Sequence, residues 1–391
     1  MSRLEELIEQ YCPDGVEYKP LGEVADVCRG TRVVKNQLLE TGYPVYQNCL
    51  TPMGCYDKTN CPKGTSFVIC GGAAGNVGYT DVDCWAADDC EYVKCGPSIL
   101  NRYVYYCLTS NQHYLLSKVR KASIPRLSPS VIKELEIPIP PLPVQEEIVR
   151  ILDSFAELQA ELQAELQKRK LQYSYYRDNL LSFSGRSDVK WMKLGDLFEF
   201  KNGVNASKEQ FGHGTPIVNY VNVYKKNSIF SSDLAGKVEL NATSIDRYRV
   251  KRGDVFFTRT SETREEVGIA SVLLDDVDDC VFSGFVLRAR PITNALLPEF
   301  CKYCFATYAV REQIIRSSTL TTRALTNGTS LSKVEILVPS LAEQQKIVDI
   351  LDRFDTLTND LAAGLPAEIE KRRQQYEYYR DKLLTFKRKT A

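Results

Sequence analysis

The chain has 391 residues, which is enough for two or three domains with substantial cores. Its 50 lysines and arginines balance its 50 aspartates and glutamates, so zero net charge excludes a globally basic nucleic-acid binder. The start of the chain is a charged amphipathic pattern, and no apolar run approaches about eighteen residues. We therefore expect a cytoplasmic protein without a membrane segment.

The thirteen cysteines form no regular framework. Their number is odd, and ten of them precede residue 108. Cys301 and Cys304 have metal-ligand spacing, but the chain has only two histidines, His113 and His213, and no second cysteine pair near them. We expect reduced structural thiols, and zinc binding or functional disulfides stay open as alternatives.

The first third of the chain has the pattern of a globular body built from short strands and helices. A short helix is predicted at Arg3–Tyr11. An apolar run at Ser66–Cys70 is typical of a buried strand, and Asn101–Ser117 has the spacing of an amphipathic helix. A strand at Leu135–Pro140 then leads into proline-rich sequence.

A long helix is predicted from Val144 to Phe183, with Pro143 at its start, where proline is tolerated. Its apolar residues recur at steps of three and four and form one narrow seam. Forty residues of helix would span about 60 Å, too far to be covered by one compact body. The seam therefore needs a second long helix.

The chain supplies that helix itself, because body and helix both recur. A second body follows, with a strand at Asp254–Thr258 and a helix at Pro298–Arg316. In the second helix, Lys371–Phe386 matches Lys168–Phe183 at eleven of sixteen positions. The second helix also holds four extra residues, so we predict a kink or break at Gly364–Pro366, with Pro366 near the start of the resumed helix.

This duplication predicts a mixed α+β fold. Two globular domains should be joined by two long antiparallel coiled-coil helices with a pseudo-twofold internal repeat. The predicted boundaries are an N-terminal helix at 1–17, a first domain at 18–142 and its helix at 143–187, then a second domain at 188–341 and its helix at 342–391.

No catalytic motif stands out. The chain lacks a phosphate-binding GxxxxGK[ST] loop, a strand-borne GxGxxG loop and an Asn-Pro-Pro-aromatic motif. The glycine-rich segment Gly71–Gly78 follows a strand, but no helix pattern opens after it, so a surface loop at a binding face is preferred over a nucleotide site. We expect a non-catalytic protein with no metal and no cofactor of its own.

Polar loops at corresponding places in the two bodies are candidates for DNA contact. They combine arginines, hydroxyls and amides, which suit phosphates and base edges. The alternative for each is an ordinary solvated loop or turn. The candidates in the first body are Gln47, Asn48, Asn76, Arg120, Lys121 and Arg126, and those in the second are Asn219, Asn222, Thr258, Arg259, Thr260, Arg264, Arg323 and Asn327.

The two long helices end in a tyrosine-rich block with more aromatic surface than a two-helix seam needs. The excess favours a docking surface for another protein. The candidates are Tyr173, Tyr176 and Arg177 in the first copy and Tyr376, Tyr379 and Arg380 in the second.

These features together resemble the specificity subunit of type I restriction-modification systems. The resemblance covers nearly the whole chain and rests on the entries at Ile137 and Val338 and on the two Tyr-Tyr-Arg-Asp-x-Leu-Leu ends. It implies two target-recognition domains that each read half of a split double-stranded DNA target. It also implies helices that fix the spacing and dock two modification subunits.

The same resemblance places S-adenosylmethionine on the modification subunits, with ATP and Mg²⁺ on the restriction subunits that complete the enzyme. Two departures from strict equivalence are Ser340 and Ala342, which replace prolines of the first entry. The rival interpretations are a related subunit of another restriction-modification enzyme and a coiled-coil scaffold with two binding heads that does not contact DNA.

Overall fold

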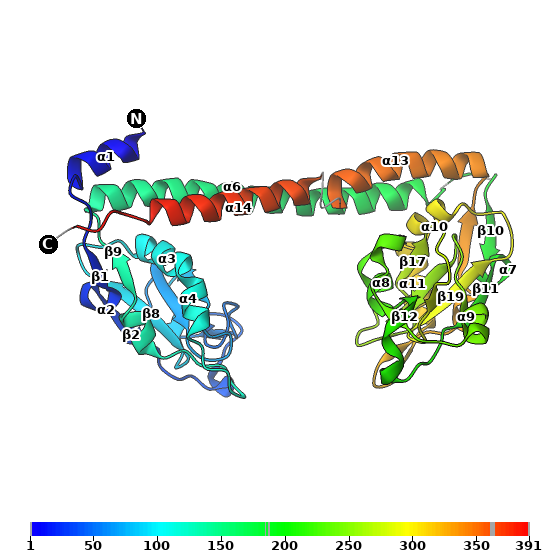
Figure 1. Ribbon diagram of the computed structural model, residues 1–391, viewed down its shortest axis with the longest axis horizontal. Coiled ribbons are helices and arrows are strands. Elements are labelled where there is room, and N and C mark those ends of the chain that lie inside the picture. Colours follow the sequence, from blue (N-terminus) through cyan, green and yellow to red (C-terminus); the bar gives the residue numbers. More distant parts are fainter. Residues whose placement is uncertain (1, 184, 187, 360–363, 390–391) are drawn as a thin grey trace. The chain divides into compact units, whose positions relative to one another are not determined.

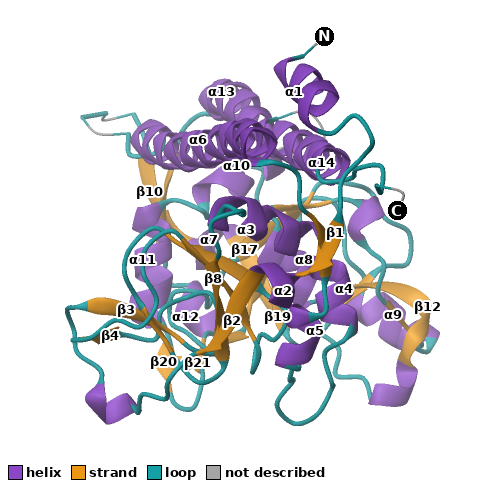
Figure 2. Ribbon diagram, turned by 90° about the vertical axis from the view of Figure 1, so that its left-hand side faces the viewer, coloured by secondary structure: helices purple, strands orange, loops and turns teal. Residues whose placement is uncertain are grey.

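The computed structural model describes residues 2–183, 185–186, 188–359 and 364–389. The chain divides into two compact units. Unit 1 comprises Met1–Gln163 and Glu368–Ala391, and unit 2 comprises Ala164–Ala367. Each unit holds one globular body together with parts of two long helices, and each is described here by itself (Figures 1 and 2).

The body of unit 1 is built on an antiparallel sheet in the order β2-β8-β5-β6. A capping box at Ser2 starts its first helix, in which the Ser2 hydroxyl accepts a hydrogen bond from the Glu5 amide. The strands are β1 (Tyr18–Pro20), β2 (Ala25–Arg29), β3 (Tyr43–Tyr46), β4 (Cys55–Tyr56), β5 (Thr65–Ile69), β6 (Val77–Thr80), β7 (Trp85–Ala86), β8 (Cys90–Cys95) and β9 (Glu136–Pro138). The helices of the body are α1 (Arg3–Tyr11), α2 (Leu21–Val24), α3 (Asn101–Ser110), α4 (Gln112–Ser117) and α5 (Pro129–Lys133).

Helix α3 lies between this sheet and α6 (Leu142–Leu180), the first long helix (Figure 1). Tyr103 and Tyr106 of α3 are fully buried and share one core with Val93 of the sheet and with Ile148 and Leu152 of α6. The apolar stripe of the long helix is therefore covered by the body on one side.

The body of unit 2 repeats this plan on a five-stranded sheet in the order β11-β19-β15-β17-β13. Its fully buried Phe300 and Tyr303 take the places of the two buried α3 tyrosines. The strands are β10 (Lys190–Lys193), β11 (Phe198–Asn202), β12 (Phe211–Val218), β13 (Ser228–Ile229), β14 (Lys237–Val238), β15 (Val255–Thr258), β16 (Thr260–Ser261), β17 (Ala270–Leu273), β18 (Val281–Phe282), β19 (Val286–Pro291), β20 (Thr319–Leu320), β21 (Ala324–Leu325) and β22 (Glu335–Val338). The helices are α7 (Leu194–Leu197), α8 (Tyr220–Lys225), α9 (Ala242–Tyr248), α10 (Pro298–Cys304), α11 (Tyr308–Ser317) and α12 (Gly328–Leu331).

The long helices are shared between the units. In unit 1, the first part of α6 pairs antiparallel with α14 (Leu365–Leu383), and Phe155 stacks on Tyr379. In unit 2, the last part of α6 pairs with α13 (Leu341–Asn359), and Tyr176 stacks on Phe354. The predicted mixed α+β fold, with two bodies, long paired helices and an internal repeat, is confirmed.

The sequence-based domain boundaries separate bodies from helices, whereas each compact unit contains both. The predicted interruption at Gly364–Pro366 borders residues 360–363, which lie outside the described residues. Helix α14 begins at Leu365 with Pro366 as its second residue, where the missing N–H leaves no hydrogen bond unmade.

Two predicted helices are each divided, which corrects the sequence-based expectation. Asn101–Ser117 breaks at Asn111, whose side-chain amide donates a hydrogen bond to the Cys107 carbonyl and competes with the helix. Pro298–Arg316 breaks after Cys304, and Thr307 starts the next helix from an extended conformation.

Unit 1 is closed by the last residues of the chain. The Val16 amide donates to the Lys387 carbonyl at 2.8 Å, and the Lys389 amide donates back to the Val16 carbonyl at 3.0 Å. Arg388 pairs with Glu136 at 2.6 Å and lies over the Tyr18 ring. The carboxyl-terminal segment thus forms part of the first body.

Candidate nucleic-acid interface

A buried glutamine at the start of each long helix fixes a body to its helix. Gln145 accepts a hydrogen bond from the Leu100 amide at 2.9 Å and donates to the Ser98 and Pro140 carbonyls at 3.0 and 2.7 Å. Gln344 makes the same three bonds in unit 2, to the Leu297 amide and the Ala295 and Pro339 carbonyls. Both side chains are fully buried, so the loop before α3 or α10 cannot shift without breaking these bonds.

A second duplicated contact joins α3 to α6 and α10 to α13. Asp153 accepts hydrogen bonds from Tyr106 and, at 2.7 Å, from Arg102. In unit 2, Asp352 accepts from Tyr303 and pairs with Lys302 at 3.3 Å. Burial raises the pKa of both tyrosine hydroxyls, which keeps them protonated as donors.

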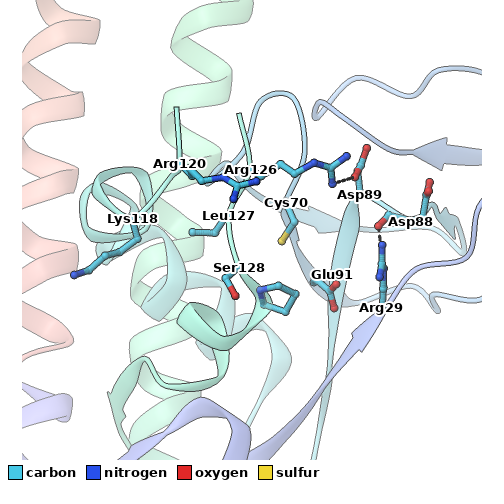
Figure 3. Close-up of a pocket in the computed structure, with 11 residues that line it drawn as sticks. Arg29, Cys70, Asp88, Asp89, Glu91, Lys118, Arg120, Arg126, Leu127 and Ser128 are labelled. Carbon is cyan, nitrogen blue, oxygen red and sulfur yellow. Dashed lines mark hydrogen bonds and ion pairs between the residues drawn. The ribbon is translucent and has the colours of Figure 1, made fainter. Parts of the chain in front are cut away.

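A pocket opens at the same place in each body. Pocket A, in unit 1, has a volume of about 400 Å³ and is lined by Arg29, Cys70, Asp88, Asp89, Glu91, Lys118, Arg120, Arg126, Leu127, Ser128 and Pro129 (Figure 3). Pocket B, in unit 2, has about 460 Å³ and is lined by Phe200, Lys201, Asn202, Arg259, Leu287, Asn327, Gly328, Thr329 and Ser332.

Strand register establishes that the two pockets correspond. Arg29 faces Glu91 at the end of the β2–β8 ladder, and Asn202 faces Leu287 at the end of the β11–β19 ladder. Cys70 follows β5 as Arg259 follows β15, and each pocket includes the residue that caps the next short helix, Ser128 or Asn327. The fold therefore builds one pocket twice and lines it differently.

Pocket A has a basic rim and an acidic floor. Arg126 pairs with Asp89 at 2.9 Å, and Arg29 donates to the Asp88 carbonyl at 3.3 Å. Lys118, Arg120 and Arg126 extend from one side of the pocket, whereas the acidic residues come from the sheet side (Figure 3). Burial raises the pKa of the Glu91 carboxyl, and it raises the pKa of the Cys70 thiol to about 12.

Pocket B has cations, hydroxyls and amides but no carboxylate among its lining residues. Arg259 donates to the Gly284 carbonyl at 3.4 Å, and Lys201 donates to the Arg247 carbonyl at 2.7 Å. Asn327 accepts from the Ser330 amide and caps α12. This lining suits acceptor groups such as phosphate oxygens or guanine O6 and N7.

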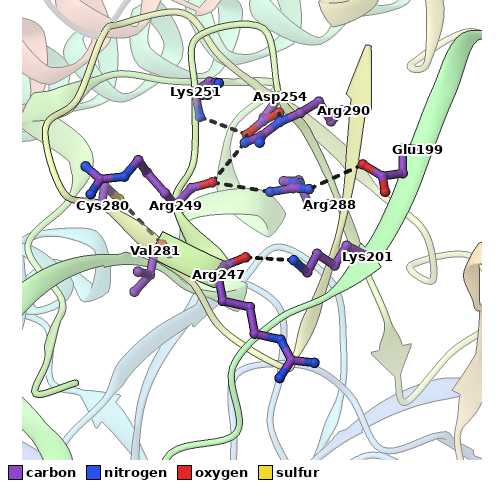
Figure 4. A network of polar contacts seen from close by, with 10 residues as sticks. All are labelled: Glu199, Lys201, Arg247, Arg249, Lys251, Asp254, Cys280, Val281, Arg288 and Arg290. Atoms are coloured by element: carbon purple, nitrogen blue, oxygen red, sulfur yellow. Dashed lines mark hydrogen bonds and ion pairs between the residues drawn. The ribbon is translucent and has the colours of Figure 1, made fainter. Parts of the chain in front are cut away.

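A cluster of cations lies near Lys201 within unit 2 (Figure 4). Arg290 pairs with Asp254 at 2.6 Å, and Arg288 donates to the Arg249 carbonyl at 3.3 Å. Burial lowers the pKa of Arg288, whose nearest carboxylate, Glu199, is 4.0 Å away. The guanidinium groups hold the Arg249 loop against the sheet.

A third pocket, pocket C, lies on unit 2 beside the exposed Phe285. It has a volume of about 360 Å³ and is lined by Tyr220, Thr260, Ser261, Glu262, Glu266, Phe285 and Arg323. The Glu266 carboxylate accepts from Tyr224 at 2.6 Å and from Ser261 at 3.0 Å, and its pKa is lowered by these bonds. Phe285, which is 64% exposed, was not among the predicted site residues, because a single phenylalanine in a turn carries no pattern.

Six of the predicted DNA-binding residues line these pockets. The structure places Arg120 and Arg126 in pocket A, Arg259 and Asn327 in pocket B, and Thr260 and Arg323 in pocket C. The other exposed candidates lie outside the three linings, namely Asn48, Lys121 and Arg264, and the half-buried Gln47 and Asn76 do so as well. The Asn76 side chain accepts from Gln112 at 3.0 Å.

Three predicted DNA contacts are engaged in internal bonds. Thr258 is fully buried, and its hydroxyl donates to the Glu266 carbonyl and accepts from the Ile269 amide. Asn219 and Asn222 form a capping box at the start of α8. Their polar groups stabilise the fold, so the expected free amides and hydroxyl are not offered to a base in this structure.

The tyrosine-rich blocks divide between core and surface. Tyr173 is only 8% exposed and belongs to the unit 2 core, and Tyr376 packs against the unit 1 core. Arg177 lies over the Tyr173 ring and Arg380 over the Tyr376 ring, and each arginine pairs with the aspartate that follows it. Tyr175 and Tyr378, which were not among the predicted docking residues, are 65% and 62% exposed.

All thirteen cysteines are free, and Cys301 and Cys304 are buried in the unit 2 core. Across residues 2–183, 185–186, 188–359 and 364–389, no three His, Cys, Asp or Glu side chains converge as a metal site would need. Within the same described ranges, no helix is long and apolar enough to cross a membrane.

Two bodies with matching pockets, each fixed to paired long helices, define a duplicated recognition protein. The chain belongs to the family described as type I restriction modification DNA specificity domain, whose family model matches residues 13–169 and 186–371. It is 34% identical to the type I restriction enzyme EcoR124I/EcoR124II specificity subunit of Escherichia coli over 310 residues, 73% of this chain and 71% of that one. It is 21% identical to the EcoKI specificity subunit of the same species over 86% of this chain and 81% of that one.

Solved structures share the fold. The S subunit of a type I restriction-modification system from M. genitalium aligns with a TM-score of 0.52 and 17% identity, covering 95% of this chain and 96% of that one. A chain from a study of complex assembly and conformational transition of the type I system aligns with a TM-score of 0.64 and 15% identity, covering 95% and 97%.

Proposed function

We propose that this protein is the non-catalytic specificity subunit of a type I restriction-modification complex in the cytoplasm. Each body reads one half of a bipartite double-stranded DNA target. The paired helices set the distance between the half-sites and dock two modification subunits. Restriction subunits complete the assembly.

The observation that carries this proposal is that both bodies are fixed to their long helices by the same hydrogen bonds, whereas their pockets are lined by different residues. Gln145 and Gln344 hold their bodies by the same three hydrogen bonds. The corresponding pockets A and B present different chemistry. A protein that reads two different half-sites with one scaffold needs both properties.

The chemistry of methyl transfer and cleavage belongs to the partners. S-adenosylmethionine would be held by the modification subunits, and ATP and Mg²⁺ by the other subunits. A net charge of zero agrees with partners that share the phosphate contacts, since a lone DNA binder needs its own excess of cations.

For subunit docking, the exposed tyrosines of the long helices are better placed than the buried ones. Tyr175 and Tyr378 occupy equivalent positions of the repeat and point their rings to solvent. Tyr176 and Tyr379 are 42% and 37% exposed and stack on Phe354 and Phe155, so they could extend the same surface. Aromatic side chains of this kind are frequent anchors at protein interfaces.

The test is to co-express the chain with its cognate modification subunit and to map methylated adenines in the host genome. A single split motif with a constant gap is expected. Arg323→Ala should relax recognition in one half of that motif only, and Arg120→Ala should act on the other half. A complex that neither binds nor methylates DNA would favour the scaffold interpretation instead.

A further inference from the structure

Glu91 occupies a position where the fold does not call for a charged residue. It lies on β8 opposite Arg29 and is only 3% exposed. Its counterpart in unit 2 is Leu287, which is 2% exposed. Burial raises the pKa of Glu91 although the charges of Arg29 and Lys133 act against the shift, so the carboxylate is only partly compensated and Glu91 in place of leucine lowers the stability of unit 1.

The Glu91 carboxylate has no hydrogen-bond or ion-pair partner among the described residues, yet it lines pocket A. A second acceptor at the pocket, Oδ1 of Asp88, is also buried without a partner within the described part of the chain. A buried carboxylate that lines a cavity and lacks a partner calls for a ligand that brings a hydrogen-bond donor.

The charges around the pocket limit which chemical groups could donate to Glu91. Four cations line the pocket, Lys118, Arg120 and Arg126 on one side and Arg29 on the sheet side, so an ammonium or guanidinium group of a protein partner would be repelled (Figure 3). A free anion suits the rim but not the carboxylate floor. The described residues around the pocket also lack the convergent ligand set of a metal site.

A neutral donor flanked by negative charge meets both conditions, and the edge of a DNA base between phosphates has this arrangement. In the major groove, cytosine presents only its N4 amino donor, whereas adenine sets an N7 acceptor beside its amino group. Adenine N7 would face the carboxylate lone pairs. The pocket chemistry therefore favours cytosine.

We infer that Glu91 is a specificity-determining residue of the first body, accepting a hydrogen bond from the N4 amino group of a cytosine that enters pocket A. This inference rests on the proposed function, because it names a base that the first body reads. The basic rim holds the neighbouring phosphates, and Asp88 provides a second acceptor.

The experiment uses the full chain in complex with its modification subunit. After the wild-type motif has been mapped, the Glu91→Leu variant, which copies Leu287 of unit 2, is mapped in the same way. The half of the motif read by the first body should contain a cytosine whose substitution the variant tolerates, with a loss of discrimination of about ten-fold at that base pair.

A binding measurement then isolates the amino group. Replacing that cytosine by 2-pyrimidinone, which lacks the N4 amino group, should weaken wild-type binding about ten-fold and leave Glu91→Leu binding unchanged. The exposed control Glu23→Leu should behave as wild type on both duplexes.

Two failures are distinct in this design. If the wild-type complex directs no methylation, the proposed function falls. Three outcomes with a clear wild-type motif overturn the inference about Glu91 and leave the proposed function standing. Glu91→Leu leaves the motif unchanged, Glu91→Leu relaxes the other half of the motif, or the first half contains no cytosine.

Discussion

The two units of this chain are alike in the contacts that fix each body to its long helix and unlike in the residues that line their pockets. Gln145 and Gln344 make the same bonds, and Asp153 and Asp352 receive the same tyrosine hydroxyl. At the pockets, Glu91 stands opposite Arg29 in one unit, and Leu287 opposite Asn202 in the other. The contacts that fix each body to its helix thus do not involve the side chains that line the pockets, and those side chains can be substituted while the fold is kept.

The strongest challenge to this equivalence is removal of the buried glutamines. Gln145→Ala and Gln344→Ala should each lower the free energy of unfolding by about 3 kcal/mol, because three hydrogen bonds are lost and the buried proline carbonyl is left without this partner. Chemical denaturation measures the effect, and the exposed Gln167→Ala is the matched control. A large loss of stability in one glutamine variant and none in the other would contradict the equivalence of the two attachments.

A smaller loss is expected at the tyrosine–aspartate contacts. Tyr106→Phe and Tyr303→Phe remove one hydrogen bond to a carboxylate and should each lower the free energy of unfolding by about 1.5 kcal/mol. Tyr105→Phe, on the same helix but without this bond, is the control. Unequal values for the two variants would mean that α3 and α10 are not fixed alike.

A substitution in pocket A should stabilise the chain, in contrast to the two kinds of variant above. Glu91→Leu should raise the free energy of unfolding by about 1 kcal/mol at neutral pH, since it removes a buried carboxylate whose burial is only partly offset by the charges of Arg29 and Lys133. Burial raises the pKa of Glu91 above its ordinary 4.5, so the unfolded chain loses this proton first and wild-type stability falls as pH rises from 4.5 through the raised value. Over that pH range, the free energy of unfolding should fall less steeply with pH in the variant than in the wild type. An equal pH dependence would show that Glu91 does not destabilise the folded chain.

The smallest effect on stability is expected at the exposed tyrosines. Tyr175→Ala and Tyr378→Ala should change the free energy of unfolding by less than about 0.5 kcal/mol, because their rings lie in solvent. Under the proposed function, both should nevertheless weaken capture of the modification subunit in a pull-down. Tyr173→Ala, in the core, should instead destabilise the chain, and a reversed order would assign docking to the inner tyrosines.

Much of this architecture could be predicted from the sequence, because the repeat and the three-to-four-residue spacing depend on local pattern. The extent of α6 and the strand β15 follow from such spacing. The site was harder to predict. Arg120, Arg126, Arg259 and Asn327 were found by composition, but Glu91 looks like any alternate residue of a strand, and only the ladder register reveals that it is buried beside Arg29.

The tyrosine blocks illustrate the same limit. Sequence spacing puts several aromatic rings close together on one helix, but burial depends on which body the helix meets. Likewise Asn219 and Asn222 have amide side chains that could bind a base edge, but these amides form the capping box of a short helix.

The closure of unit 1 by Lys387 and Lys389 has a consequence for the order of synthesis. Unit 2 is one continuous stretch, Ala164–Ala367, and its core needs α13 but not the rest of the second long helix. Unit 1 is built from two separate stretches: the core that holds Ile148 and Leu152 also includes Leu384, so it is complete only when the second stretch joins the first. A chain truncated before Glu368 would therefore keep the residues of unit 2 and lack part of the unit 1 core, although most of unit 1 precedes unit 2 in the sequence.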